Sequence, residues 1–104
     1  MNETKLRGAM GFAMRAGKCI TGDFASERAV KHGNACWMVL LDDTASEATQ
    51  KRYSAMCEQR KIPCLLIPDM GRAIGKDGRM VAVITDARFA EMIQSAYKSE
   101  DNAN

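Results

Sequence analysis

Apolar residues in this chain change between helical spacing and short unbroken runs. The first group repeats every three or four residues, as one face of an amphipathic helix does. Its members are Leu6, Ala9, Met10, Ala13 and Met14. Gly17 follows this group, and we expect the first helix to end there.

The unbroken apolar runs predict strands. Residues 37–41, 64–67 and 80–84 are almost entirely apolar, which is typical of strands covered on both faces. A very short fourth strand is predicted near Cys19–Thr21. Trp37 begins the run at 37–41, so we expect its side chain in the core, with a platform for base stacking as the less favoured alternative.

Two further helices are predicted between these strands. Asp23 can cap a second helix that ends at Gly33. Thr44-Ala45-Ser46-Glu47 has the spacing of a capping box, so a third helix should start there. Their core-facing residues are expected to be Ala25, Ala29, Val30, Ala48, Tyr53, Met56 and Cys57.

The last third of the chain predicts a short fourth helix and a final longer one. Asp69 can cap the fourth helix, which would run through Ile74, and Thr85 or Asp86 can cap the last. On the last helix we expect the core-facing residues to be Phe89, Met92, Ile93, Ala96 and Tyr97. Because helices alternate with short buried strands, the pattern predicts an α/β protein, a three-layer α/β/α sandwich. We expect one domain at 1–98 and a polar, disordered tail at 99–104.

The composition narrows the class of protein. A chain of 104 residues, 46% hydrophobic and 27% charged, is typical of one globular domain. No apolar run approaches the roughly 20 residues that cross a bilayer, and the N-terminus lacks the layout of a secretory signal. We therefore expect a cytoplasmic protein without membrane contact. The four cysteines form no C-x-x-C pair, so we expect free thiols rather than a zinc site, and no cofactor.

Residues that could support catalysis are few. There is no nucleophile elbow, and Gly71-Arg72-Ala73-Ile74-Gly75-Lys76 fails as a P-loop because Asp77 stands where Ser or Thr should follow. His32 is expected at a helix C-terminus, where a structural role explains it. Asp42-Asp43 follows a strand and could hold a substrate or metal, although the approach to a helix explains the pair better. We expect no enzyme.

Two loops combine glycine with positive charge. They are Gly17-Lys18-Cys19-Ile20-Thr21-Gly22-Asp23 and residues 71–79, which include Arg72, Lys76 and Arg79. Glycine lets the backbone approach a ligand closely, and a helix start favours anions. The net charge of +2 alone does not indicate nucleic acid, but residues 1–33 contain six basic and three acidic residues. This distribution favours a basic face that could contact RNA phosphates.

Several motifs together resemble the ribosomal L7Ae/L30e family, and among its members the small bacterial L7Ae-like proteins described as ribosomal. They follow in the family's order over about 6–96: Gly11-Phe12-Ala13-Met14-Arg15-Ala16-Gly17-Lys18, Ala29-Val30-Lys31-His32-Gly33, Val39-Leu40-Leu41-Asp42-Asp43-Thr44-Ala45-Ser46, Lys61-Ile62-Pro63, Met70-Gly71-Arg72-Ala73-Ile74-Gly75-Lys76 and Val81-Ala82-Val83-Ile84-Thr85-Asp86. The resemblance implies an α/β/α sandwich around a mixed four-stranded sheet. It also implies RNA binding, in archaeal and eukaryotic relatives often at kink-turns.

The family's G-x-N-E-x-x-K signature at the start of the second helix becomes Gly22-Asp23-Phe24-Ala25-Ser26-Glu27-Arg28. Phe24 and Ala25 replace the asparagine and glutamate that read sheared G·A pairs in relatives. The resemblance therefore implies RNA binding here without those base-edge hydrogen bonds. An exposed Phe24 could stack on an unpaired base, and a Phe24 tucked against the core is the open alternative.

From both lines of reasoning we expect RNA, ribosomal or otherwise structured, as the partner, together with ribosomal or ribosome-assembly proteins. The expected RNA-binding residues are Lys18, Thr21, Gly22, Asp23, Phe24, Arg28, His32, Ile74, Gly75, Lys76 and Arg79. The alternative function is a protein-interaction adapter on the same fold that does not bind RNA.

Overall fold

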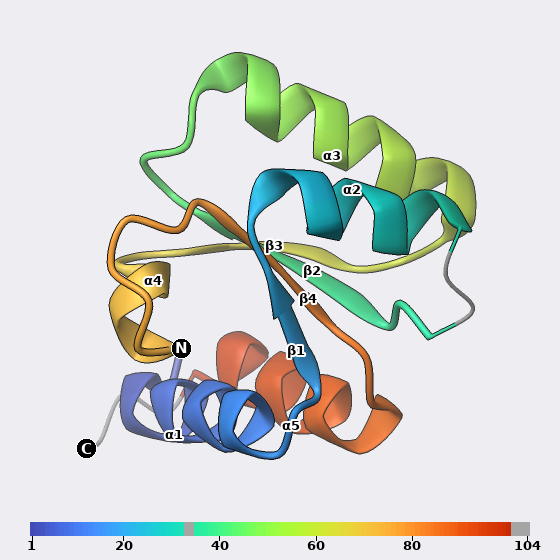
Figure 1. The fold of residues 1–104 in the computed structure, drawn as a ribbon. Helices are drawn as coiled ribbons and strands as arrows, with labels where there is room; N and C mark the ends of the chain where they lie inside the picture. The colour runs from blue at the N-terminus through green and yellow to red at the C-terminus, as the bar shows by residue number, and fades with distance from the viewer. Residues whose placement is uncertain (33–34, 101–104) are drawn as a thin grey trace.

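The computed structural model describes residues 1–32 and 35–100. Helices and strands alternate along these residues (Figure 1). The elements are α1 (Glu3–Arg15), β1 (Cys19–Thr21), α2 (Asp23–His32), β2 (Met38–Asp42), α3 (Glu47–Arg60), β3 (Cys64–Ile67), α4 (Met70–Ala73), β4 (Val81–Ile84) and α5 (Ala87–Lys98). The expected helix end at Gly33 and residues 101–104 of the expected tail at 99–104 lie outside the described residues. Ser99 is described, and its carbonyl accepts a hydrogen bond from the N-terminal amine of Met1.

The strands form one mixed sheet. Within the described residues it has four strands in the order β1-β4-β2-β3. β2 runs parallel to β3, whereas β4 is antiparallel to both β1 and β2. The register places Thr21 opposite Ala82. The residues just before β4 therefore lie beside the start of α2.

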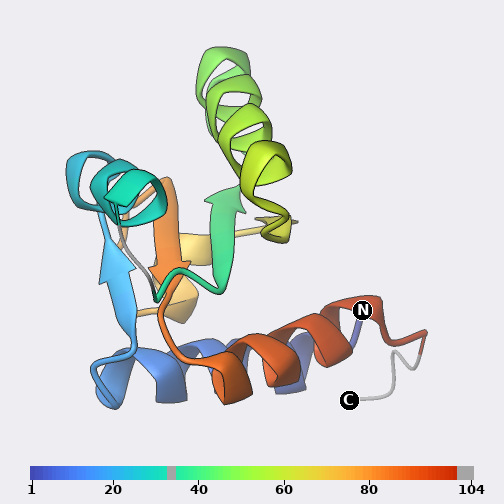
Figure 2. The same cartoon turned by 90° about the vertical axis from the view of Figure 1, so that its right-hand side faces the viewer.

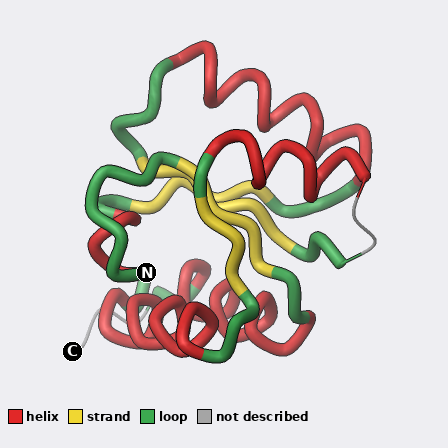
Figure 3. The backbone as a smooth tube through the Cα atoms, in the orientation of Figure 1, coloured by secondary structure: helices red, strands yellow, loops and turns green. Residues whose placement is uncertain are grey.

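Helices cover both faces of the sheet. Met38, Leu40 and Ile84 point to the face that α1, α4 and α5 cover, whereas Val39 and Val83 point to the face that α2 and α3 cover. Figure 2 shows α1 and α5 as one layer, with α2 and α3 on the opposite side of the strands. The tube in Figure 3 shows the same sandwich, with the strands between the helical layers. The predicted three-layer α/β/α architecture is confirmed. In the described part of the chain, none of the helices is long and apolar enough to cross a bilayer.

Three of the predicted helix starts need correction. The second helix begins at Asp23 itself, so Asp23 is its first residue and not its cap. The third helix is capped by Ser46, whose hydroxyl accepts a hydrogen bond from the Thr49 N–H at 3.1 Å, and not by Thr44. Asp69 does not cap α4, because it lies in the left-handed region at φ 53° and its side chain accepts no capping hydrogen bond. Asp86 does cap α5, accepting from the N–H groups of Arg88 and Phe89.

Five expected core residues lie at the surface instead. One is Leu66, which is 41% exposed because β3 is an edge strand of the sheet. Trp37 is 51% exposed, and it lies just before β2, which begins at the next residue. Met92 is 49% exposed, because α5 packs on α1 and the sheet through Ile93 and its neighbours. Ala25 and Ala48 are exposed for the same kind of reason: each helix buries a narrower face than its apolar residues suggest.

Candidate nucleic-acid interface

The two loops with glycine and positive charge meet at Gly22. Its φ is +95°, its N–H donates to the Val81 carbonyl at 3.1 Å, and its carbonyl accepts from the Ser26 N–H at 2.9 Å. A Cβ at this position would lie 2.8 Å from the Arg79 Nη1. The Arg79 guanidinium therefore lies directly against the turn into α2, in space that only a glycine leaves open.

The loop at 75–79 packs against the backbone of Gly71. The Lys76 N–H donates to the Gly71 carbonyl at 2.8 Å, and the Arg79 N–H donates to the Lys76 carbonyl at 3.1 Å. A Cβ on Gly71 would lie 2.5 Å from the Lys76 carbonyl oxygen. The loop therefore packs on the backbone of α4, and this contact fixes where Lys76 and Arg79 stand.

Asp23 is the first residue of α2, and its carboxylate bonds to α3 instead of capping its own helix. The Arg52 Nη2 lies 3.1 and 2.9 Å from the two carboxylate oxygens, and the Tyr53 hydroxyl donates to Oδ1 at 2.6 Å. Hydrogen bonds from Arg52 and then Tyr53 hold the pKa of Asp23 below its usual value. Burial and then the nearby Asp23 raise the pKa of Tyr53. The predicted capping role of Asp23 is therefore replaced by a link between α2 and α3.

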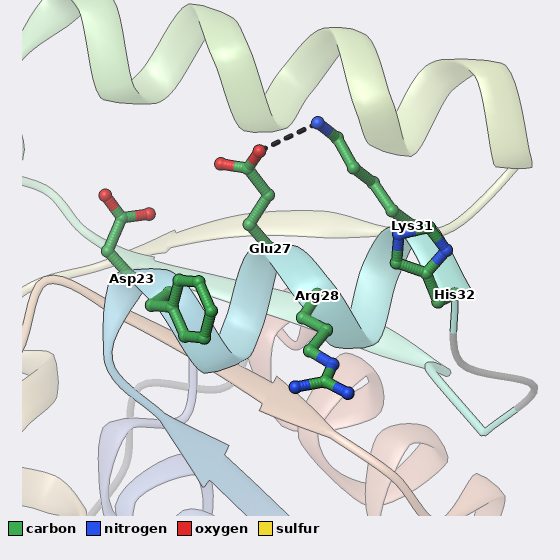
Figure 4. A pocket seen from close by; sticks show the side chains of 6 residues that line it. Asp23, Glu27, Arg28, Lys31 and His32 are labelled. Carbon is green, nitrogen blue, oxygen red and sulfur yellow. Dashed lines mark ion pairs between the residues drawn. The ribbon is translucent and has the colours of Figure 1, made fainter.

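The second carboxylate of α2, Glu27, is also neutralised. Lys31 Nζ lies 2.8 Å from Glu27, and Arg52 pairs with the same carboxylate. The hydrogen bond from Lys31 is the main reason that the pKa of Glu27 falls below its usual value. In Figure 4, Glu27 and Lys31 extend toward α3 while Arg28 extends the other way. The negative charge of α2 is thus turned toward α3 and paired there.

The opposite side of α2 carries Phe24, Arg28 and His32, spaced four residues apart. All three are exposed, and Phe24 reaches 82%. Among residues 1–32 and 35–100, neither Arg28 nor His32 makes an ion pair. A shallow hollow of about 630 Å³ is bordered by these three side chains and also by Asp23, Glu27 and Lys31. Of the two orientations left open for Phe24, the structure has the outward one.

The other expected site residues lie in four different places. Gly75 and Lys76 are exposed on the 75–79 loop, and Thr21 lies half-buried in β1 beside Gly22. Ile74 is 4% exposed and packs in the core, so its expected place on the binding surface needs correction. Lys18 is exposed at the far end of β1, where its carbonyl accepts from the Thr85 N–H.

Asp42, one of the two candidate active-site carboxylates, has a structural function. It is 6% exposed, and it accepts hydrogen bonds from the Thr44 N–H at 2.8 Å and the Met70 N–H at 3.0 Å. Burial opposes ionisation most, but the hydrogen bonds from Thr44 and Met70 keep the pKa of Asp42 below its usual value. Asp42 thus fastens the end of β2 to the start of α4. In the described part of the chain, no group of three metal-ligating side chains is found.

Sequence reasoning missed the residues that support this surface. Arg52 and Tyr53 hold Asp23 although 29 and 30 residues separate them. No motif indicated that contact, because it depends on how α2 packs on α3. Gly71 belongs to a basic loop in the sequence, but its contact with the Lys76 carbonyl depends on a turn that the sequence pattern does not reveal.

The family follows from a match over most of the chain. The model of the ribosomal protein L7Ae/L30e/S12e/Gadd45 family matches residues 4–93. The chain belongs to this family. Two relatives carry the name RNA-binding protein YlxQ. The one from Bacillus subtilis (strain 168) is 33% identical over 89 residues, which cover 83% of this chain and 88% of the relative. The one from Enterococcus faecium is 32% identical over 93 residues, covering 86% and 88%.

Solved structures agree with this assignment. A Bacillus halodurans protein described as having unknown function matches with a TM-score of 0.84 at 30% identity, over 91% of this chain and 98% of that one. A Giardia lamblia 15.5kD RNA binding protein matches with a TM-score of 0.72 at 16% identity, over 91% and 87%. The second likeness shows the shared fold alone. The expected family and its mixed four-stranded sheet are both confirmed.

Proposed function

We propose that this family member is a non-enzymatic RNA-binding protein, associated with the ribosome or with another structured RNA. The RNA element would be kink-turn-like or otherwise non-duplex, and it would bind at the start of α2 and at the 75–79 loop. The observation that carries the proposal is the position of the Arg79 guanidinium against Gly22, 2.8 Å from where a Cβ would stand. This contact joins two separate basic loops into one surface. The names of the YlxQ relatives support RNA as the ligand.

Phosphate binding at this surface follows from its electrostatics. The first N–H groups of a helix have no partner within the helix, and the helix dipole favours an anion there. Asp23 would repel a phosphate at this place, but Arg52 bonds to both of its oxygens. Arg28, Lys76 and Arg79 then supply the positive charge that pairs with the RNA backbone.

Recognition in this chain would depend on RNA shape and on an unpaired base. Phe24 and Ala25 occupy the positions from which relatives read sheared G·A pairs, and neither side chain can donate or accept a hydrogen bond. The exposed Phe24 ring can instead stack on an extruded base. We therefore expect a preference for bent or bulged RNA over a straight duplex.

Fluorescence anisotropy with a kink-turn RNA and a straight duplex of equal length, each at several salt concentrations, tests the proposal. Arg28→Ala and Lys76→Ala should each weaken binding and reduce the slope of log K against log salt by about 1. Lys98→Ala is the matched control, because Lys98 is an exposed cation at the end of α5, across the sheet. Equal affinities and salt slopes for all four proteins would reject this surface as the binding site.

A second candidate function, binding of a protein partner, is favoured by one apolar hollow. It lies between α1 and α5, has a volume of about 670 Å³, and is bordered by Phe12 and Met92, which are 56% and 49% exposed. Absorbance of the purified protein distinguishes the two functions. Excess absorbance at 260 nm indicates co-purified RNA and supports the first candidate, whereas its absence supports an adapter.

A further inference from the structure

Trp37 is held in place by its backbone while half of its side chain stays in solvent. Its N–H donates to the Ile84 carbonyl at 2.9 Å, and β2 begins at the next residue. The side chain is 51% exposed and borders a hollow of about 370 Å³. A large aromatic surface on a fixed backbone can receive a flat ligand with little loss of conformational entropy.

Two cations border the same hollow. Arg60 ends α3, and Lys61 follows it in the left-handed region at φ 56°. The turn is fixed because the Ile62 N–H donates to the Cys57 carbonyl and the Pro63 carbonyl accepts from the Val39 N–H, each at 2.9 Å. In the described part of the chain neither cation forms an ion pair.

This hollow continues the surface along α2. A neighbouring hollow of about 390 Å³ is bordered by Arg28, His32 and Cys36. Arg28 and His32 also border the hollow beside Phe24, and Cys36 also borders the hollow beside Trp37. In Figure 1, α2 runs from the end of β1 toward the side of the molecule where β2 begins. The three hollows thus form one path, called here the α2 track, from Phe24 to Trp37.

The chemistry of the α2 track matches single-stranded RNA. Its part along α2, from Phe24 to His32, spans eight residues, or about 12 Å. Cations lie between the two exposed rings, which is the arrangement by which proteins follow an unpaired strand. The carboxylates near it are Asp23 and Glu27, which are paired with Arg52, and Glu91, which borders the Trp37 hollow from α5.

We propose that the α2 track binds a single-stranded RNA segment that continues from the structured element at the start of α2. In this arrangement one base stacks on Trp37 and the neighbouring phosphates pair with Arg60 and Lys61. The inference rests on the proposed function and extends it, because it assigns a second contact on the opposite end of the α2 surface and predicts that flanking nucleotides add affinity.

The test uses two RNAs that share one kink-turn, one blunt and one carrying an unpaired extension, with the extension placed in turn on each strand end. Trp37 is the only tryptophan in the chain, so its fluorescence reports stacking directly. We expect one extended RNA to bind more tightly than the blunt RNA and to quench Trp37. Trp37→Ala should weaken binding of that RNA by about 5- to 100-fold and leave the blunt RNA unchanged.

Lys61→Gly removes the proposed contact between Lys61 and a phosphate without harming the fold, because glycine adopts the left-handed region freely. It should weaken binding of the extended RNA and lower its salt slope by about 0.7. Lys98→Ala should change neither. If the blunt RNA binds but no extension adds affinity or quenches Trp37, this inference is overturned and the proposed function stands. If neither RNA binds, the proposed function fails and this inference fails with it.

Discussion

The contact between Gly71 and the 75–79 loop leads to the sharpest prediction. We consider Gly71→Ala, which adds one methyl group beneath the loop. The new Cβ would lie 2.5 Å from the Lys76 carbonyl oxygen, and 3.1 and 3.2 Å from the Arg79 nitrogen and oxygen. All three are backbone atoms, so no side-chain rotation can relieve the overlap. The loop must move by about 1 Å to restore ordinary contact distances of about 3.5 Å.

The energetic cost follows from two opposing effects. Inserting a methyl group into a well-packed site costs about 1–3 kcal/mol, whereas replacing glycine by alanine within a helix contributes about 0.5–1 kcal/mol. We expect a net loss of about 0.5–2 kcal/mol and a fall in Tm of several degrees, at about 4–8 °C per kcal/mol. Lys76 and Arg79 move with the loop, so RNA affinity should also decrease.

Gly8→Ala is the matched control, because a Cβ on this helical glycine meets nothing within 4 Å. It should stabilise the protein by about 0.5–1 kcal/mol and leave RNA binding unchanged. Urea unfolding followed by circular dichroism measures the free energies of both variants, and anisotropy measures their affinities. A Gly71→Ala protein as stable as Gly8→Ala, with wild-type affinity, would refute the argument that Gly71 positions the loop.

Three further predictions concern the carboxylates. Asp42→Asn should lower the free energy of unfolding by about 1–3 kcal/mol in urea titrations, because the NH2 group of Asn then faces the N–H of Thr44 or Met70 and can accept no hydrogen bond from it. Unchanged stability would contradict the role of Asp42 as a link between β2 and α4. Tyr53→Phe should cost about 1 kcal/mol and raise the pKa of Asp23 in an NMR titration, since the lost hydroxyl donates to that carboxylate at 2.6 Å; an unmoved Asp23 pKa would refute the bond. The folded pKa values of Asp23 and Asp42 are lowered, so their stabilisation is full above about pH 5 and is lost as pH falls through the folded values. Unfolding free energies compared at neutral and acidic pH should show this loss, and a smaller loss in Tyr53→Phe; a stability that rises on acidification would show the opposite sign.

Most of the fold could be predicted because its signals are local. Unbroken apolar runs predicted β2, β3 and β4 to within one or two residues of their observed bounds. Errors arose where a neighbouring element decides the outcome. Thr44 matched a capping box, but Asp42 engages it in the turn after β2, so Ser46 caps α3. Trp37 and Met92 matched the apolar pattern of their segments, and only the packing of complete elements shows that both lie at the surface.

The candidate site was predictable only in part, for a related reason. The sequence placed glycine and cations in two loops, and the antiparallel pairing of β1 with β4 brings Gly22 and Arg79 together. No spacing rule distinguishes Ile74, which anchors the loop in the core, from its exposed neighbours. The roles of Arg52 and Tyr53 depend on contacts between α2 and α3, which the sequence pattern does not specify. The expected cytoplasmic location stays a prediction.

The arrangement of charge explains how a chain with a net charge of only +2 can present a surface suited to RNA. Carboxylates at a helix start stabilise the helix by interacting with its dipole, yet they would repel phosphates at the same place. Here Arg52 pairs with both Asp23 and Glu27 from α3, and Lys31 also pairs with Glu27, so each carboxylate of α2 has a cationic partner. Arg28, on the opposite side, keeps its charge unpaired by protein groups in the described part of the chain. The packing of α3 on α2 therefore leaves Arg28 as the unpaired charge of α2 in the described part of the chain, which the sum of charges along the sequence does not show.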